Sequence, residues 1–313
     1  MECKQNPEES YEFFKDIENY IKQAILAENT DVSSDAESEC VSFMNSFGSH
    51  FKDIQTAKRI CKQFIKLYYS LKGTTGNFNS EPKYQKCREF LNYWLNFKLR
   101  ENLKNGDDTV CYIYNAIESQ FTNSLEHYIN LYFIYDIDKN DLYKMNILYS
   151  LYENYNKLNA IKYNNPELDK QSLLTHSSAC CIDYIKASYI CNPDNNNNNI
   201  NGKFCEKLTA FQSKYDKLYE EAAGKGSDYS KNFIRLSECG NNKIITTAVT
   251  GSIVGLIPLF GILYKFTPMG QMFRSKKGIL NNDEEMTKIS STEHDNEPLR
   301  FQQGSYNIKY ESL

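Results

Sequence analysis

Apolar residues recur every three or four positions through most of residues 1–243, which is the spacing of one face of an α-helix. Alternating patterns of the kind that strands show are nearly absent. The pattern closes at a glycine-rich break that contains Gly224 and Gly226. It predicts an all-α helical bundle. The expected core positions are Phe14, Ile17, Ile21, Ile25, Ile54, Ala57, Cys61, Phe64, Tyr68, Leu71, Cys87, Phe90, Leu91, Trp94, Leu95, Ile113, Ile117, Phe121, Leu125, Tyr128, Tyr132, Leu148, Leu151, Tyr155, Leu158, Ile161, Leu208, Phe211, Tyr215, Leu218 and Ala222.

Polar, glycine-containing or proline-containing stretches interrupt the helical pattern and predict loops at 72–82, 104–108, 163–168 and 191–203. The last stretch holds a run of asparagines, which cannot bury apolar surface. It lies between Cys191 and Cys205, and a disulfide between these two residues would close its base.

Residues 244–264, from Ile244 to Tyr264, contain no charged side chain, and Lys243 and Lys265 flank them. A helix of this length extends roughly 30 Å, the thickness of a bilayer core. The stretch therefore predicts a single transmembrane helix, followed by a short polar, disordered tail at 265–313. Pro258 is compatible with this prediction, because proline is tolerated in membrane helices.

Gly251 and Gly255 form a GxxxG pattern within the predicted span. Small residues at this spacing let two membrane helices pack closely, which would make a homodimer. The alternative is that small residues are simply frequent in membrane spans.

The ten cysteines all precede the apolar segment. This asymmetry indicates disulfides formed outside the cytosol by residues 1–243, with the tail in the cytosol. Basic residues are nearly balanced around the segment, so they add little to the orientation. The alternative for the cysteines is ordinary buried thiols. The candidate disulfide cysteines are Cys3, Cys40, Cys61, Cys87, Cys111, Cys180, Cys181, Cys191, Cys205 and Cys239.

The composition argues against several other classes. A net charge of −4 with both signs spread along the chain gives no nucleic-acid footprint. No metal site is expected, because the sequence has no CxxC pair and His50, His127 and His176 are far apart. Phosphate-binding and hydrolase motifs are missing as well. We expect no cofactor. Most of the 24 tyrosines fall on core stripes, and an exposed subset would suit a recognition surface.

Catalysis has one candidate pair. His176 and Cys180 are four residues apart, which places them on one face of a helix, as a thiolate–imidazolium pair requires. Such a pair beside further cysteines is more often structural, so we expect no enzymatic activity and no catalytic residue.

Two sequence stretches resemble a known family. CREFLNYWLNFKLRE at 87–101 and YKFTPMGQMFRSKKG at 264–278, together with the cysteine-rich helical domain and the late span, look like the Plasmodium interspersed repeat (PIR) superfamily, and specifically its Vir branch. The resemblance implies a variant surface antigen of a malaria parasite. It would act in immune evasion, with cytoadhesion of the infected red cell as a further role, and would meet host receptors and host antibodies. The implied location is the infected erythrocyte membrane or a parasite-derived membrane.

One feature of parasite export is missing, because no Arg-x-Leu-x-Glu/Gln/Asp signal lies near the start. A second function is weighed separately: an intracellular membrane-anchored scaffold that remodels host or parasite membranes, with reduced thiols facing the cytosol.

Overall fold

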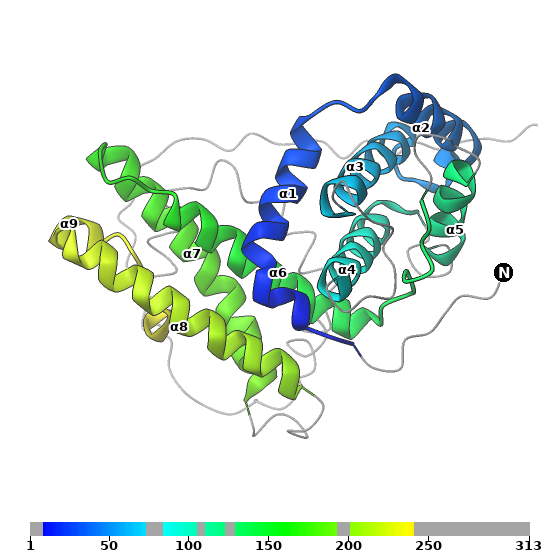
Figure 1. Cartoon of the computed structure of the whole chain (residues 1–313). Coiled ribbons are helices and arrows are strands. Elements are labelled where there is room, and N and C mark those ends of the chain that lie inside the picture. Colours follow the sequence, from blue (N-terminus) through cyan, green and yellow to red (C-terminus); the bar gives the residue numbers. More distant parts are fainter. Residues whose placement is uncertain (1–8, 73–83, 105–109, 123–128, 193–200, 241–313) are drawn as a thin grey trace, which may run out of the picture. The chain divides into compact units, whose positions relative to one another are not determined.

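The structure is a computed structural model and describes residues 9–72, 84–104, 110–122, 129–192 and 201–240. The chain divides into two units, Met1–Ile253 and Val254–Leu313, and all the described residues belong to the first. Within these ranges the regular structure is helical and no strand is present (Figure 1). The prediction of an all-α fold is therefore confirmed for the described residues.

The predicted transmembrane helix at 244–264 and the predicted tail at 265–313 lie outside the described residues, and both stay predictions. Among the helices that the structure does describe, none is both long and apolar enough to cross a membrane.

A short 3-10 helix, η1 (Glu12–Asp16), continues directly into α1 (Ile17–Asn29). Within α1, each step of four residues advances the side chain by about 40° around the axis, because one turn takes 3.6 residues. The prediction that Ile25 lies in the core is wrong, because its side chain is 44% exposed. It projects to one side of the buried face, which consists of Ile17, Tyr20, Ile21, Ala24 and Ala27.

Ser33 caps the start of α2 (Ser34–Phe47), because its hydroxyl oxygen accepts a hydrogen bond from the backbone N–H of Ala36. One 3-10 turn, η2 (Gly48–His50), then leads to α3 (Ile54–Lys72), which packs against α2. A β-carbon at Gly48 would lie 2.4 Å from Cγ1 of Ile54, so only glycine allows this close approach. Ile54 is 49% exposed, and its predicted place in the core is wrong because it covers this turn at the surface.

Helix α4 (Gln85–Asn102) buries a continuous stretch of side chains at its centre, and α5 (Val110–Phe121) packs beside it. The predicted stripe of α5 continued to Tyr132, but the helix ends at Phe121 and Tyr132 is exposed in a non-helical segment. This segment is held to α5 by Oε1 of Glu118, which accepts a hydrogen bond from the backbone N–H of Leu131 at 2.6 Å. Leu125 and Tyr128 lie outside the described residues.

Helices α6 (Lys139–Asn159) and α7 (Pro166–Cys191) form a long hairpin and pack against each other along most of their length (Figure 1). Pro166 occupies the start of α7, where its missing N–H costs nothing. The loop predicted at 163–168 therefore extends too far, because its last residues belong to the first turn of this helix.

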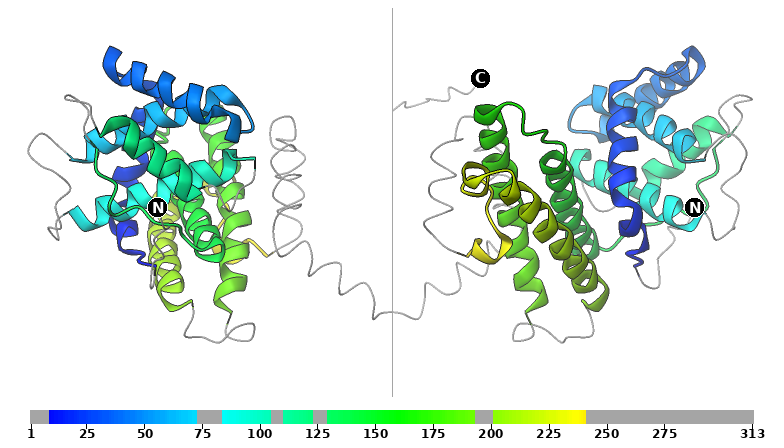
Figure 2. Two further views of the ribbon diagram at one scale, coloured as in Figure 1. Left: turned by 90° about the vertical axis from the view of Figure 1, so that its right-hand side faces the viewer. Right: turned by 60° about the vertical axis from the view of Figure 1, so that its left-hand side comes forward.

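Helix α8 (Gly202–Gly224) packs against α6 and buries all five residues predicted for its core. The short α9 (Ser227–Ser230) and a 3-10 turn, η5 (Leu236–Glu238), carry the chain back to α7. The hydroxyl of Tyr215 donates to the carbonyl oxygen of Ile234 at 2.8 Å, which holds this return segment on α8. Helix α1 contacts both α3 and α6, so it joins the earlier helices to the later ones (Figure 2).

Candidate functional site

The strongest functional candidates in the sequence are the cysteines, and three disulfides join pairs of described residues. Cys40 of α2 is bonded to Cys61 of α3, with their Cα atoms 5.6 Å apart. Both side chains are fully buried, so this bridge runs through the core. The expectation that cysteines on helices join neighbouring helices is confirmed here.

Two bridges hold the C-terminal part of the described chain to α7. Cys181 is bonded to Cys239, and Cys191, at the end of α7, is bonded to Cys205 in α8. The second bridge closes the asparagine-rich stretch at its base, as predicted. Cys111 is also disulfide-bonded, and Cys3 lies outside the described residues.

Cys87 and Cys180 are free thiols, so their inclusion among the disulfide candidates is wrong. Cys87 is half-buried, with its sulfur 3.6 Å from the hydroxyl oxygen of Tyr20. The Cys180 thiol is fully buried and lies 3.8 Å from the carbonyl oxygen of Leu151 on α6. Each thiol therefore contacts a partner across a helix interface, as the buried-thiol alternative expects.

The candidate catalytic pair lies on the face of α7 that packs against α6. Nδ1 of His176 is 3.1 Å from Oδ1 of Asn154, and Cys180 contacts Leu151 one turn away. Burial raises the pKa of Cys180 well above its ordinary value and lowers the pKa of His176. Both groups are thus held in their neutral forms, which is the opposite of a thiolate–imidazolium pair.

The stretch at 87–101 has a structural role that its helical pattern did not predict. Asn92 and Asn96, spaced four residues apart, point from α4 toward the non-helical segment around Tyr135 and are fully buried. Oδ1 of Asn92 accepts from the N–H of Tyr135 at 3.0 Å, and Nδ2 of Asn96 donates to its carbonyl oxygen at 2.8 Å. Oδ1 of Asn96 also accepts from the N–H of Ile137, at 3.2 Å.

Arg100 lies one turn beyond Asn96 on the same face of α4, and its side chain donates to the carbonyl oxygen of Ile137 at 2.7 Å. The amide side chains thus give the segment the hydrogen bonds that a neighbouring strand would supply. The signal in the sequence was the placement of Asn92, Asn96 and Arg100 at intervals of four, one face of a helix whose other positions are largely apolar.

Aromatic residues of the same stretch form the centre of the core. The ring of Tyr93 stacks on Phe13 of η1, with 5.4 Å between their centroids, and Phe90 stacks on Tyr20 of α1 at 4.8 Å. The hydroxyl of Tyr93 donates to Oδ1 of Asn146 on α6 at 2.9 Å. The stretch therefore connects three parts of the chain, which accounts for its residue types without any catalytic role.

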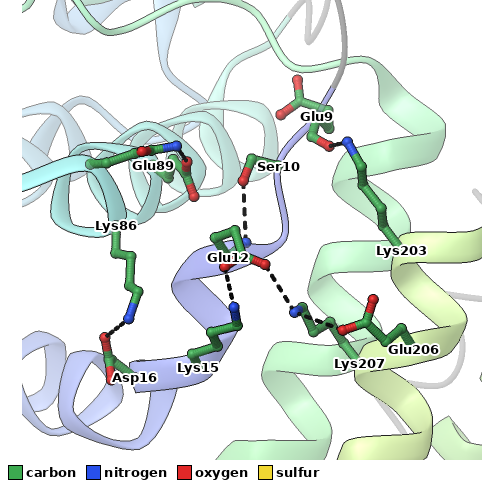
Figure 3. Close-up of polar contacts among 11 residues, drawn as sticks. Glu9, Ser10, Glu12, Lys15, Asp16, Lys86, Glu89, Lys203, Glu206 and Lys207 are labelled. Carbon is green, nitrogen blue, oxygen red and sulfur yellow. Dashed lines mark hydrogen bonds and ion pairs between the residues drawn. The ribbon is translucent and has the colours of Figure 1, made fainter. Parts of the chain in front are cut away.

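Ion pairs join the 3-10 helix η1 to α4 and to α8 (Figure 3). Lys86 of α4 pairs with Asp16 at 2.8 Å, and Lys207 of α8 pairs with Glu12 at 3.2 Å. Lys15, with Lys207, holds the pKa of Glu12 below its ordinary value. These carboxylates are ion-paired rather than paired with one another, so they do not form an acid–base couple.

No group of three metal-ligating side chains lies close enough to hold an ion within the part of the chain that the structure describes. Exposed tyrosines in this part include Tyr112 on α5, Tyr189 on α7, and Tyr132 in the non-helical segment that follows α5. Tyr112 packs edge-on against both Phe47 and His50, with 5.5 Å between ring centroids in each pair. These side chains come from separate elements, so the recognition surface expected from the tyrosines stays a prediction.

No protein-family model, no curated protein and no solved structure matches the chain. The resemblance to the PIR superfamily therefore rests on the sequence stretches that carry it, and the function it implies is a proposal.

Proposed function

We propose that this chain is a membrane-anchored surface antigen of the Vir type. Its disulfide-bonded helical domain faces the outside, and one helix at 244–264 anchors it in the infected erythrocyte membrane or a parasite-derived membrane. Its role is immune evasion, with adhesion as a further role, and its partners are host antibodies and a host receptor. It is not an enzyme.

The observation that carries the proposal is a set of three disulfides, two of which join helices while the third ties the segment after η5 to α7. Their Cα separations of 5.1, 5.6 and 5.7 Å fall in the range that disulfides need. Such bonds persist in secreted and surface proteins and are rare in the cytosol, where thiols are kept reduced. They therefore support an oxidising compartment for this domain, and they count against the scaffold alternative, which needs reduced thiols.

Antibodies to residues 1–243 on infected cells test the display directly. They should bind intact cells, and trypsin added outside should remove their epitopes. Antibodies to residues 265–313 are the matched control, because they should bind only after permeabilisation. If the domain resisted external trypsin while the tail was digested, surface display would be wrong.

Thiol labelling separates the antigen from the scaffold. In the protein isolated from cells and denatured without a reductant, an alkylating reagent should reach Cys87 and Cys180. The disulfide-bonded cysteines of the described residues, Cys111 included, should react only after reduction. Reaction of all of them without reduction would favour the scaffold.

A further inference from the structure

Two neighbouring cysteines of α7 differ in their covalent state. Cys181 is bonded to Cys239, which directly follows η5, whereas Cys180 is a free thiol. In thiol–disulfide exchange, a thiolate attacks one sulfur of a disulfide and the other sulfur leaves. A second covalent form of the domain therefore needs no further cysteine, because Cys180 can take the place of Cys181 in the bond to Cys239.

The second form requires only a small movement of the backbone. The Cα atoms of Cys181 and Cys239 are 5.1 Å apart. Consecutive Cα atoms are about 3.8 Å apart, so those of Cys180 and Cys239 are separated by at most about 9 Å. A disulfide tolerates a Cα separation of up to about 7 Å. A shift of about 2 Å would therefore bring Cys239 within bonding range of Cys180.

Hydrogen bonds on one face of α7 favour the bond to Cys181. Ser177 lies one turn before Cys181, and its hydroxyl oxygen accepts a hydrogen bond from the backbone N–H of Ile234 at 3.2 Å. The hydroxyl of Tyr215 on α8 donates to the carbonyl oxygen of the same isoleucine at 2.8 Å. These bonds place the segment 234–239 against the face of α7 that carries Ser177 and Cys181.

Helix α6 covers the sulfur of Cys180. This thiol is fully buried, and its sulfur lies 3.8 Å from the carbonyl oxygen of Leu151. One turn earlier in α7, Nδ1 of His176 is 3.1 Å from Oδ1 of Asn154, which also belongs to α6. Burial raises the pKa of Cys180, and only the thiolate attacks a disulfide. Exchange therefore requires α6 to move away from this part of α7.

We propose that the packing of α6 on Cys180 determines which of two disulfides the domain holds. When α6 separates from this part of α7, water reaches the Cys180 thiol and accepts its proton. The thiolate then attacks the sulfur of Cys239, and the bond from Cys239 to Cys181 breaks. Cys181 leaves as a thiolate and takes up a proton, so the number of disulfides is unchanged and no oxidant or reductant is consumed.

The exchange moves the end of the described chain around α7. Neighbouring positions of a helix project about 100° apart, so a bond to Cys180 holds Cys239 on a different side of this helix. The hydrogen bond between Ile234 and Ser177 belongs to the first form, because Ser177 and Cys181 share one face. Loosening of the α6–α7 contact is thus recorded as a covalent change.

The Leu151→Ala variant of the full-length chain tests this proposal, because it truncates the residue of α6 that contacts Cys180. The variant is incubated in detergent at mildly alkaline pH, quenched with acid, denatured without a reductant and alkylated. Mass spectrometry then identifies which of the two neighbouring cysteines carries the label. We expect several-fold more label on Cys181 than in the wild type, together with a peptide that joins Cys180 to Cys239.

Two controls separate exchange from a general loss of stability. Leu95→Ala removes an equally buried leucine from α4 and should give the wild-type labelling. Adding Cys180→Ser to Leu151→Ala should abolish the label on Cys181, because the attacking sulfur is missing. If Leu151→Ala does not fold, Asn154→Ala takes its place, since it removes the contact with His176 from the same interface.

Two results would overturn the proposal. One is label confined to Cys180 in the α6 variant after an incubation that exchanges the bonds of the unfolded wild type. The other is equal label on Cys181 in the α6 variant and in Leu95→Ala, because exchange would then follow general unfolding and not the loss of the α6 contact.

Discussion

Asn92 and Asn96 illustrate how a polar side chain in the core can specify a fold. Both are fully buried, and both hold the backbone of the segment around Tyr135. A buried backbone group without a partner costs free energy comparable to a lost hydrogen bond. These amides therefore remove a cost that the helical fold would otherwise impose, because a non-helical segment crosses its core.

Replacing Asn96 with leucine should destabilise the protein by about 2–4 kcal/mol, because the carbonyl of Tyr135 and the N–H of Ile137 lose their partner inside the core. Urea unfolding of the full chain in detergent measures the loss. The matched control is Asn102→Ala on the same helix, since Nδ2 of Asn102 bonds only to the carbonyl of Lys98. A loss at Asn96 no larger than in the control would show that the buried hydrogen bonds of Asn96 do not stabilise the fold.

The buried imidazole of His176 leads to a prediction about how the free energy of unfolding depends on pH. Burial lowers its pKa in the folded chain, whereas the unfolded chain keeps a value near 6.5. As the pH falls below 6.5, the unfolded state takes up the proton first, so stability decreases until the folded pKa is passed. The His176→Gln variant keeps a donor for Asn154 but cannot titrate.

The free energy of unfolding of this variant should therefore fall less than that of the wild type between pH 7 and pH 5. Parallel curves for the two proteins would show that the imidazole is not desolvated as the structure indicates.

At the scale of elements, the bridges differ in what they hold. Cys40 and Cys61 are part of the core, whereas Cys191 and Cys205 are half-buried at helix ends. The first bridge therefore contributes packing as well as a covalent link. The second acts mainly by closing a chain segment across which the two cysteines are 14 residues apart.

Replacing Cys191 and Cys205 together with serine should cost about 3 kcal/mol, the loss expected for a loop of this length. Hydrogen exchange should rise at the end of α7 and the start of α8. The Cys40→Ala, Cys61→Ala double variant should lose more, because its loop is of similar length and buried sulfur contacts are also removed. Equal losses would mean that the core contacts around Cys40 and Cys61 add nothing.

How far the sequence predicted the elements depended on whether each helix has one apolar face. All five core positions predicted for α8 are buried, since this helix has one apolar face, although Phe204 and Lys207 are buried as well and were not predicted. Helix α7 has no comparable stripe, and no core positions were predicted for it. Ile25 failed because two steps of four residues from Ile17 carry its side chain about 80° around α1, off the buried face.

The cysteines were predictable as a class and only partly as pairs. The closure of the asparagine-rich stretch by Cys191 and Cys205 followed from their position in the sequence. That Cys181 rather than Cys180 bonds to Cys239 depends on a rotation of about 100° between neighbouring helix positions, which turns one sulfur toward α6 and the other toward the returning chain. This choice is set by packing, and no spacing rule contains it.

At the scale of the whole molecule, the proposed anchor follows the disulfide-bonded domain closely in the sequence. Cys239, which is bonded to Cys181, is separated from the uncharged segment only by residues 240–243. A domain on so short a connection has few orientations available relative to a membrane.

Lengthening the connection tests this constraint. Twelve glycine and serine residues inserted after Gly240 should leave the fold and flotation with vesicles unchanged, because the insertion follows the last bridged cysteine. They should also raise the rate at which external trypsin releases the domain from intact cells, since the reach of a flexible chain grows with its length and the protease gains access to the connection. A rate equal to that of the unaltered chain would mean that the short connection does not limit access to the domain.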